Sequence, residues 1–108
     1  MLARYPESFV NLPSTVHAGP RFRPGRIFAT PAALEVIANA RVSILYLLIR
    51  HVQGDWGDIC DEDRQQNELS VEAGLRLLSC YRLPGGGAVW IITEWDRSAT
   101  TILLPDEY

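Results

Sequence analysis

The spacing of hydrophobic and polar positions divides the chain into two parts. Residues 1–26 keep no period of 2 or 3.6 and hold four of the seven prolines. Because proline fixes φ and lacks an N–H group, this composition predicts an irregular N-terminal arm. Residues 27–108 show helical spacing and then strand-like alternation, which together predict a single α+β domain. The arm could pack on this domain through Tyr5, Phe9, Val10 and Phe22.

Two short helices are predicted at the start of the domain. Thr30 followed by Pro31 is typical of an N-cap and a first helical position, so the first helix is expected over 31–38. The second helix is expected over 42–52, with Gly54 just beyond its end. This second helix is apolar on nearly every side, which predicts a central and buried position.

A third helix is predicted over 62–73, and it differs from the first two because most of its side chains are polar. Asp61 is the cap residue that we expect before it. Acidic residues in its first turn suit the positive end of the helix dipole. Gly74 is expected to close the helix.

After Gly74 the period of the hydrophobic positions falls to 2, which predicts strands. The predicted strands run over 75–82, 88–94 and 100–104, and a shorter β-type run stands at 26–29. Short connections between the last three imply an antiparallel arrangement. Trp90 and Ile92 share one strand face, which we expect to form the core. The predicted fold class is therefore α+β, with two or three short helices packed on a three-stranded antiparallel β-meander at the C-terminal end.

Composition and charge limit the classes of function. A chain of 108 residues can bury one core, which leaves no room for a separate substrate domain. The formal net charge of −3 argues against direct contact with nucleic acid, because that contact needs a basic face. The apolar run at 42–49 is too short to span a membrane, and no signal peptide is visible. We therefore expect a cytoplasmic protein that contacts no membrane.

The sequence predicts neither a metal site nor a cofactor. Cys60 and Cys80 lie in no close pair and share no ligand pattern with His17 or His51. The three glycines at 85–87 form a turn signal with no helix or lysine after it, unlike a phosphate-binding loop.

The densest polar stretch, residues 50–58, brings His51, Asp55 and Asp58 together around two glycines. One interpretation is catalytic, with His51 as a general base, Asp55 orienting it and Asp58 as a second acid or a metal ligand. The other interpretation is structural, because His51 lies in a last helical turn and both aspartates can bond main-chain N–H groups. Carboxylates in tight loops more often have the structural role.

Charge is distributed unevenly along the chain. Residues 1–26 hold four arginines against one acid, and residues 53–72 hold seven acids against Arg64. The acidic stretch can receive the basic arm, or it can engage a basic partner protein. We expect both Trp56 and Trp95 to be exposed. The residues that we expect at a partner contact are Asp55, Trp56, Asp58, Asp61, Glu62, Asp63 and Trp95.

Several stretches carry a resemblance to a known family. They include RHVQGDWGD at 50–58, WIITE at 90–94 and DRSATTILLP at 96–105. With these stretches the chain resembles, over residues 28–108, a family of small bacterial proteins found mainly on plasmids and integrated elements. Members carry labels such as "plasmid-related protein" or "type I restriction endonuclease subunit M". The chain is too short for a methyltransferase fold and has no glycine-rich loop after a strand.

The resemblance implies a protein that acts by stoichiometric contact with host machinery. We therefore predict a non-enzymatic binding protein, carried on a mobile element, that modulates a host protein complex as an anti-CRISPR or anti-restriction inhibitor. The alternative is a small hydrolase or nucleotide-handling enzyme centred on His51, Asp55 and Asp58.

Overall fold

The computed structural model describes residues 19–108. The predicted arm at 1–26 therefore falls mostly outside the described residues, as do Tyr5, Phe9 and Val10. Residues 19–25 form no helix or strand, as predicted for the arm. Phe22 within this segment is buried, so this part of the arm packs on the domain.

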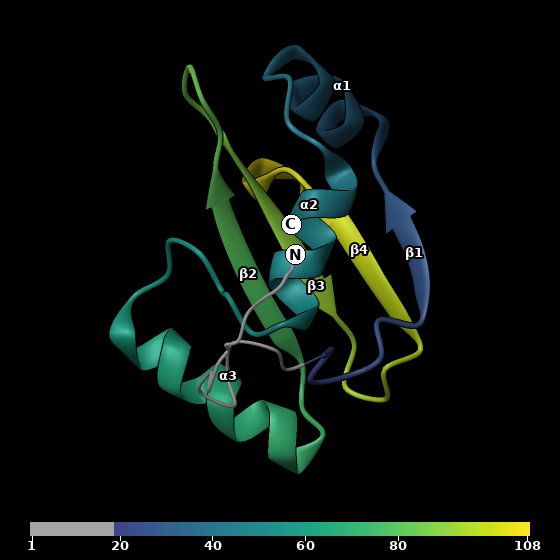
Figure 1. Ribbon diagram of the computed structural model, residues 1–108, viewed down its shortest axis with the longest axis vertical. Helices are drawn as coiled ribbons and strands as arrows, with labels where there is room; N and C mark the ends of the chain where they lie inside the picture. The colour runs from purple at the N-terminus through teal and green to yellow at the C-terminus, as the bar shows by residue number, and fades with distance from the viewer. Residues whose placement is uncertain (1–18) are drawn as a thin grey trace, which may run out of the picture.

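Three helices and a four-stranded sheet confirm the α+β class (Figure 1). Figure 1 shows α2 across one face of the sheet, with α3 beside β2. All predicted bounds are correct to within two residues. In chain order the elements are β1 (Arg26–Ala29), α1 (Pro31–Asn39), α2 (Ile44–Val52), α3 (Asp61–Ala73), β2 (Leu77–Arg82), β3 (Ala88–Thr93), β4 (Ala99–Leu103) and the 3-10 turn η2 (Pro105–Glu107).

The sheet has the strand order β1-β4-β3-β2. The last three strands in sequence form the predicted antiparallel meander. The run at 26–29 adds a fourth strand, which pairs in parallel with β4 and places Phe28 opposite Thr101. Parallel pairing between distant segments needs a long crossover, and here the connection contains all three helices and then β2 and β3. The sheet is therefore mixed rather than three-stranded and antiparallel.

The helix ends follow the predicted signals in three of four cases, and Gly54 stands just beyond the end of α2 with φ of 84°. Thr30 caps α1 by accepting from the Ala33 N–H at 3.1 Å. Gly74 ends α3 in the left-handed conformation, with φ of 71°. Asp61 is not the cap of α3 as predicted, because Cys60 holds that position and makes no side-chain cap bond.

Most of the core lies on the sheet face that α2 covers, opposite to the face predicted, although Ile92 on the predicted face is also buried. Val89, Ile91 and Thr93 have no exposed surface, whereas Trp90 is half-buried. On the other face the Tyr108 ring packs edge-on against Trp90, with 5.4 Å between centroids. The alternation along β3 was correct, but alternation alone does not say which face the helices cover.

The prediction that α2 is buried on every side was wrong. Leu47 and His51 face the sheet, and the opposite side of the helix is open to solvent. Leu45, Tyr46 and Ile49 expose 66%, 57% and 44% of their surfaces. A domain of this size has only one layer of helices on the sheet, so a helix that is apolar all round must leave one side uncovered.

The outer edge of β2 is covered by residues from two other segments. Cys80 exchanges main-chain bonds with residues 56–58: its N–H donates to the Trp56 carbonyl, and its carbonyl accepts from the Asp58 N–H. The Asn67 side chain bonds both the N–H and the carbonyl of Leu78. Because an uncovered edge invites pairing with another chain, these bonds close one side of the sheet.

We predict that Gly57→Ala destabilises the fold strongly. Gly57 has φ of +77°, and a Cβ there would stand 2.1 Å from the Cys80 carbonyl oxygen, well inside contact distance. The expected loss in free energy of unfolding is about 2–4 kcal/mol. Urea denaturation followed by circular dichroism measures this loss.

Gly74→Ala is the matched control for this substitution. Gly74 has a similar φ of +71°, but nothing stands within 4 Å of its Cβ position. Only backbone strain is added there, at about 1 kcal/mol. Equal losses for the two variants would contradict the close approach of residues 56–58 to β2.

Candidate functional site

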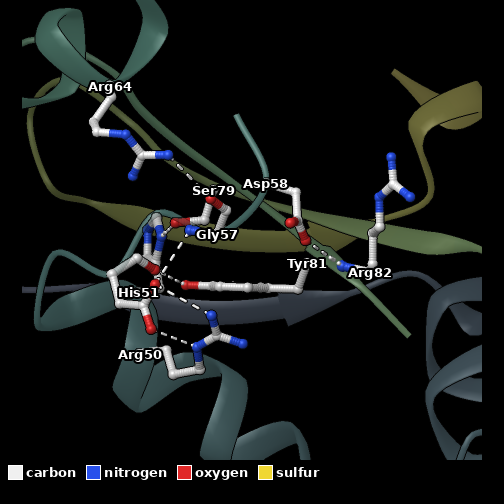
Figure 2. Close-up of polar contacts among 9 residues, drawn as sticks. Arg50, His51, Gly57, Asp58, Arg64, Ser79, Tyr81 and Arg82 are labelled. Carbon is white, nitrogen blue, oxygen red and sulfur yellow. Dashed lines mark hydrogen bonds and ion pairs between the residues drawn. The ribbon is translucent and has the colours of Figure 1, made fainter. Parts of the chain in front are cut away.

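His51, the proposed general base, lies fully buried between α2 and the sheet. Its Nδ1 is 2.6 Å from the Ser79 hydroxyl on β2, and its Nε2 is 2.8 Å from the Thr93 hydroxyl on β3. Figure 2 shows the Ser79 hydroxyl beside the ring. Both ring nitrogens therefore bond hydroxyl groups of the sheet.

These bonds form one directed chain from β2 to the N-terminal segment. The chain ends at the Pro24 carbonyl, which can only accept, so the Thr100 hydroxyl donates to it at 2.6 Å. Thr100 then accepts from Thr93, 2.7 Å away, and Thr93 accepts from His51 Nε2–H. His51 Nδ1 is left as the acceptor for the Ser79 hydroxyl. The chain fixes the histidine as the neutral Nε2–H tautomer.

Burial holds this histidine in the neutral form. Desolvation, and after it the positive charge of Arg97, lower the pKa of His51 from 6.5 to about 3. A protonated ring would also need Ser79 to accept rather than donate. A base whose pKa lies near 3 and whose ring has no solvent access is poorly placed to accept a proton from a substrate near pH 7.

The catalytic interpretation requires Asp55 to orient His51, and in the structure Asp55 does not do so. Its carboxylate pairs with Arg50, with Oδ2 2.7 Å from Arg50 Nε and Oδ1 3.2 Å from Nη2. Bonding to this guanidinium holds the pKa of Asp55 below its ordinary value. The same guanidinium lies 4.5 Å from the centroid of Tyr81, whose hydroxyl donates to the Asp55 carbonyl.

Asp58 has a structural contact of its own. Its Oδ2 accepts from the Arg82 N–H at 3.2 Å, which extends the cover of the β2 edge (Figure 2). His51, Asp55 and Asp58 are therefore each engaged with different groups. The structural interpretation holds for the aspartates, which bond the main-chain N–H groups of Gly57 and Arg82, but His51 bonds buried hydroxyls rather than carbonyls of the helix end. The catalytic geometry does not form.

Trp56 was predicted to be exposed, and that prediction was wrong. Only 1% of its surface is exposed, and its indole N–H donates to Glu68 at 2.9 Å. Its ring stacks on Phe22, with 6.1 Å between centroids. The two glycines beside it fold the loop inward, which brings the tryptophan under the N-terminal segment.

Glu68 also receives the arm. Arg21 donates to both of its carboxylate oxygens, at 2.9 and 2.8 Å. The ring of Phe22 packs edge-on against His51 at 5.2 Å, and the Arg97 guanidinium lies 5.6 Å from its centroid. The charge asymmetry had two interpretations, and the Arg21–Glu68 ion pair supports the one in which the basic arm docks on the acidic stretch.

The buried hydroxyls of this chain were missed in the sequence, although a signal was present. Three polar residues, Ser79, Thr93 and Thr100, stand at inward positions of strands along which buried and more exposed residues alternate. Polar side chains at core positions require partners, and a histidine on the facing helix is a suitable one.

The remaining predicted contact residues lie at the surface. Trp95 exposes 65% of its surface, as predicted. Within α3 the residues that turn inward are Asn67 and Ser70, so the acidic first turn stays open to solvent. The exposed acidic residues of the predicted set are Asp55, Asp58, Asp61, Glu62 and Asp63.

Residues 19–108 contain neither a cluster of metal ligands nor a single membrane-spanning helix. There, no group of three or more His, Cys, Asp or Glu side chains is arranged to hold a metal ion. No single helix in the same range could cross a membrane; α1 and α2 reach the required length and apolarity only as a pair bent by 107°.

The chain was compared with protein-family models, with curated proteins and with solved structures, and nothing matches. The resemblance to proteins of mobile elements therefore stays a prediction.

The histidine predicts a specific pH dependence of stability. The folded pKa of His51 lies near 3 and its unfolded value near 6.5, so the unfolded state binds the proton first. The stability linked to neutral His51 is fully present above pH 6.5. Below that, the free energy of unfolding falls by about 1.4 kcal/mol for each unit that the pH drops. Urea denaturation between pH 7.5 and about 5 stays above most carboxylate titration.

A His51→Gln variant is the control for this measurement. Glutamine has one donor and one acceptor but no charge change, so the slope over the same pH range should be lost. An unchanged slope would show that another group is responsible.

The direction of the chain can be tested by removing its middle hydroxyl. Thr93→Val deprives His51 Nε2–H of its acceptor and Thr100 of its donor, at an expected cost of about 2–4 kcal/mol. Thr101→Val, on the opposite face of the neighbouring strand, should cost less than about 1 kcal/mol. Similar losses for the two variants in thermal denaturation would contradict the chain.

Proposed function

We propose that this protein is a non-enzymatic binding module that engages a partner protein through the outer face of α3. The observation that carries the proposal is that one set of residues in this helix contacts the domain and another set is exposed to solvent. Asn67, Ser70 and Glu68 fasten it to the domain, whereas Asp61, Glu62 and Asp63 make no such contact with residues 19–108 and are exposed. A rigidly mounted acidic face suits a basic protein surface.

Exposed apolar side chains accompany this charge. Leu69, at the middle of α3, exposes 64% of its surface. Arg97 bonds the carbonyls of Ser70 and Leu75, which holds the turn carrying Trp95 against the C-terminal end of the helix. Exposed tryptophan and leucine beside charged groups are typical of interface centres with a polar rim.

The target class proposed is a host defence complex of the CRISPR or restriction type. Its support is the resemblance to mobile-element proteins, together with the structural engagement of His51, Asp55 and Asp58. The enzyme alternative has no comparable support, because each of its three residues bonds a different group. A stoichiometric inhibitor needs a stable surface and no reactive centre.

Charge reversal on α3 tests this function. The variant Glu62→Arg/Asp63→Arg should weaken binding to the target complex about tenfold, and more at low salt, because rim charges act through long-range attraction. The measurement is inhibition of purified CRISPR or restriction complexes, titrated to an end point of one chain per complex.

Glu35→Arg, an exposed acid on α1, is the matched control and should inhibit like the wild type. Inhibition that is equal in both variants would rule out the α3 face. If the purified wild type turns over a substrate in the absence of any target complex, the enzyme alternative replaces the binding proposal.

A further inference from the structure

The two edges of the sheet differ in how their main-chain groups are used. At β2, the groups that point outward are bonded by Asn67 and by residues 56–58. At β1, the Arg26 and Thr30 N–H groups donate inward, to the carbonyls of Ser98 and Ile102. Successive residues of a strand direct their polar groups to opposite sides, so Ile27 and Ala29 direct theirs outward.

The outer side of β1 faces no other described element. Figure 1 shows β1 at the right-hand margin of the sheet, and the strand order ends there. Edge strands are usually protected by short length, charged side chains, Pro or a bulge; β1 is short and has one charged residue, Arg26, but it contains neither Pro nor a bulge. Ile27 and Phe28 instead expose 46% and 48% of their surfaces.

An apolar groove lies beside this edge, on the face that carries α2. No charged residue lines this groove. Its wall is formed by Pro24, Ile27, Leu45, Leu48, Ile49 and Val52. The open side of α2 and the open edge of β1 therefore form one continuous surface. Such a surface is larger and more apolar than isolated exposed side chains on a monomer.

We propose that β1 pairs antiparallel with β1 of a second copy of this chain, which joins the two sheets across a two-fold axis. The outward groups fix the register, because Ile27 of each copy must exchange both bonds with Ala29 of the other. Phe28 then meets its own counterpart on the axis. All four outward groups of each copy are used, and the surface is self-complementary as a two-fold interface requires.

Charge complementarity supports a second copy rather than an unrelated strand. In this register Arg26 of one copy stands opposite Thr30 of the other. Thr30 donates to Glu107 Oε1 at 2.7 Å, and the Leu104 N–H donates to the same oxygen at 2.9 Å. Glu107 therefore lies beside Thr30 with Oε2 directed to no group within residues 19–108. Each Arg26 meets a Glu107, twice in the dimer, while the two Arg26 side chains stay apart.

Side-chain direction agrees with this pairing. The Arg26 guanidinium lies 5.7 Å from the centroid of Phe28, so both occupy the sheet face away from α2. Glu107 belongs to η2, whose neighbour Tyr108 packs on Trp90 on that same face. The proposal goes beyond the binding function, since it uses the edge opposite to α3 and stands or falls without it.

Sedimentation velocity of the full chain, from micromolar to hundreds of micromolar, tests the proposal. The wild type should sediment as a dimer at the upper concentrations. Arg26→Glu and Glu107→Arg should each weaken self-association about tenfold, because like charges then face each other. The double variant Arg26→Glu/Glu107→Arg exchanges the charges and should restore association to within about threefold of the wild type.

A second pair of variants separates association from folding. Phe28→Asp places two carboxylates opposite each other on the axis and should abolish the dimer with an unchanged circular dichroism spectrum. Trp95→Asp, at an even more exposed hydrophobic position away from β1, should leave the dimer intact. A monomeric wild type would overturn the proposal and reserve this edge for a foreign strand. A dimer that resists Phe28→Asp, or that the exchanged charges fail to restore, would also overturn it.

Discussion

The chain of hydrogen bonds through His51 is the constraint on which the rest of the structure depends. It joins α2 to β2, β3 and β4 and ends at the carbonyl of Pro24, so it connects the helix layer, the sheet and the N-terminal segment. Every buried polar group in it has one assignable role, which makes the arrangement unique rather than merely compact. The aromatic contacts of Phe22 and Trp56 pack around the same ring. Shifting α2 by one residue would leave a series of hydroxyls unsatisfied.

Polar bonding also explains why the two ends of the sheet behave differently. The loop at 54–58 had a catalytic and a structural interpretation from its sequence, and in the structure its aspartates bond an arginine and a strand edge. That use of Asp58 closes the β2 side. The crossover that brings β1 next to β4 provides no equivalent cover, so the unprotected edge follows from the topology and not from any one residue.

Local signals made the elements predictable to within two residues, because caps, turn glycines and alternation act through neighbours in sequence. Thr30, Gly74 and the glycines at 85–87 are examples. The covered face of β3, the open side of α2 and the burial of Trp56 were predicted wrongly, because each depends on which segment packs where. The same limit applies to His51: its sequence neighbours suggested Asp55, whereas its partners are 28 and 42 residues away. Inward polar residues on strands were the one local sign of that network.

The way α3 is attached has a consequence for its dynamics. Its buried residues Asn67 and Ser70 bond other parts of the domain, and Val71 packs on the cluster of Phe22, Trp56 and Leu77. Releasing the helix would uncover this apolar cluster, so the opening has an appreciable heat-capacity change and an appreciable denaturant dependence. Amide hydrogen exchange in α3 should then be accelerated by denaturant rather than proceed through a denaturant-independent local opening. The acidic first turn is in this way presented on a helix that stays beside β2 for as long as the domain is folded.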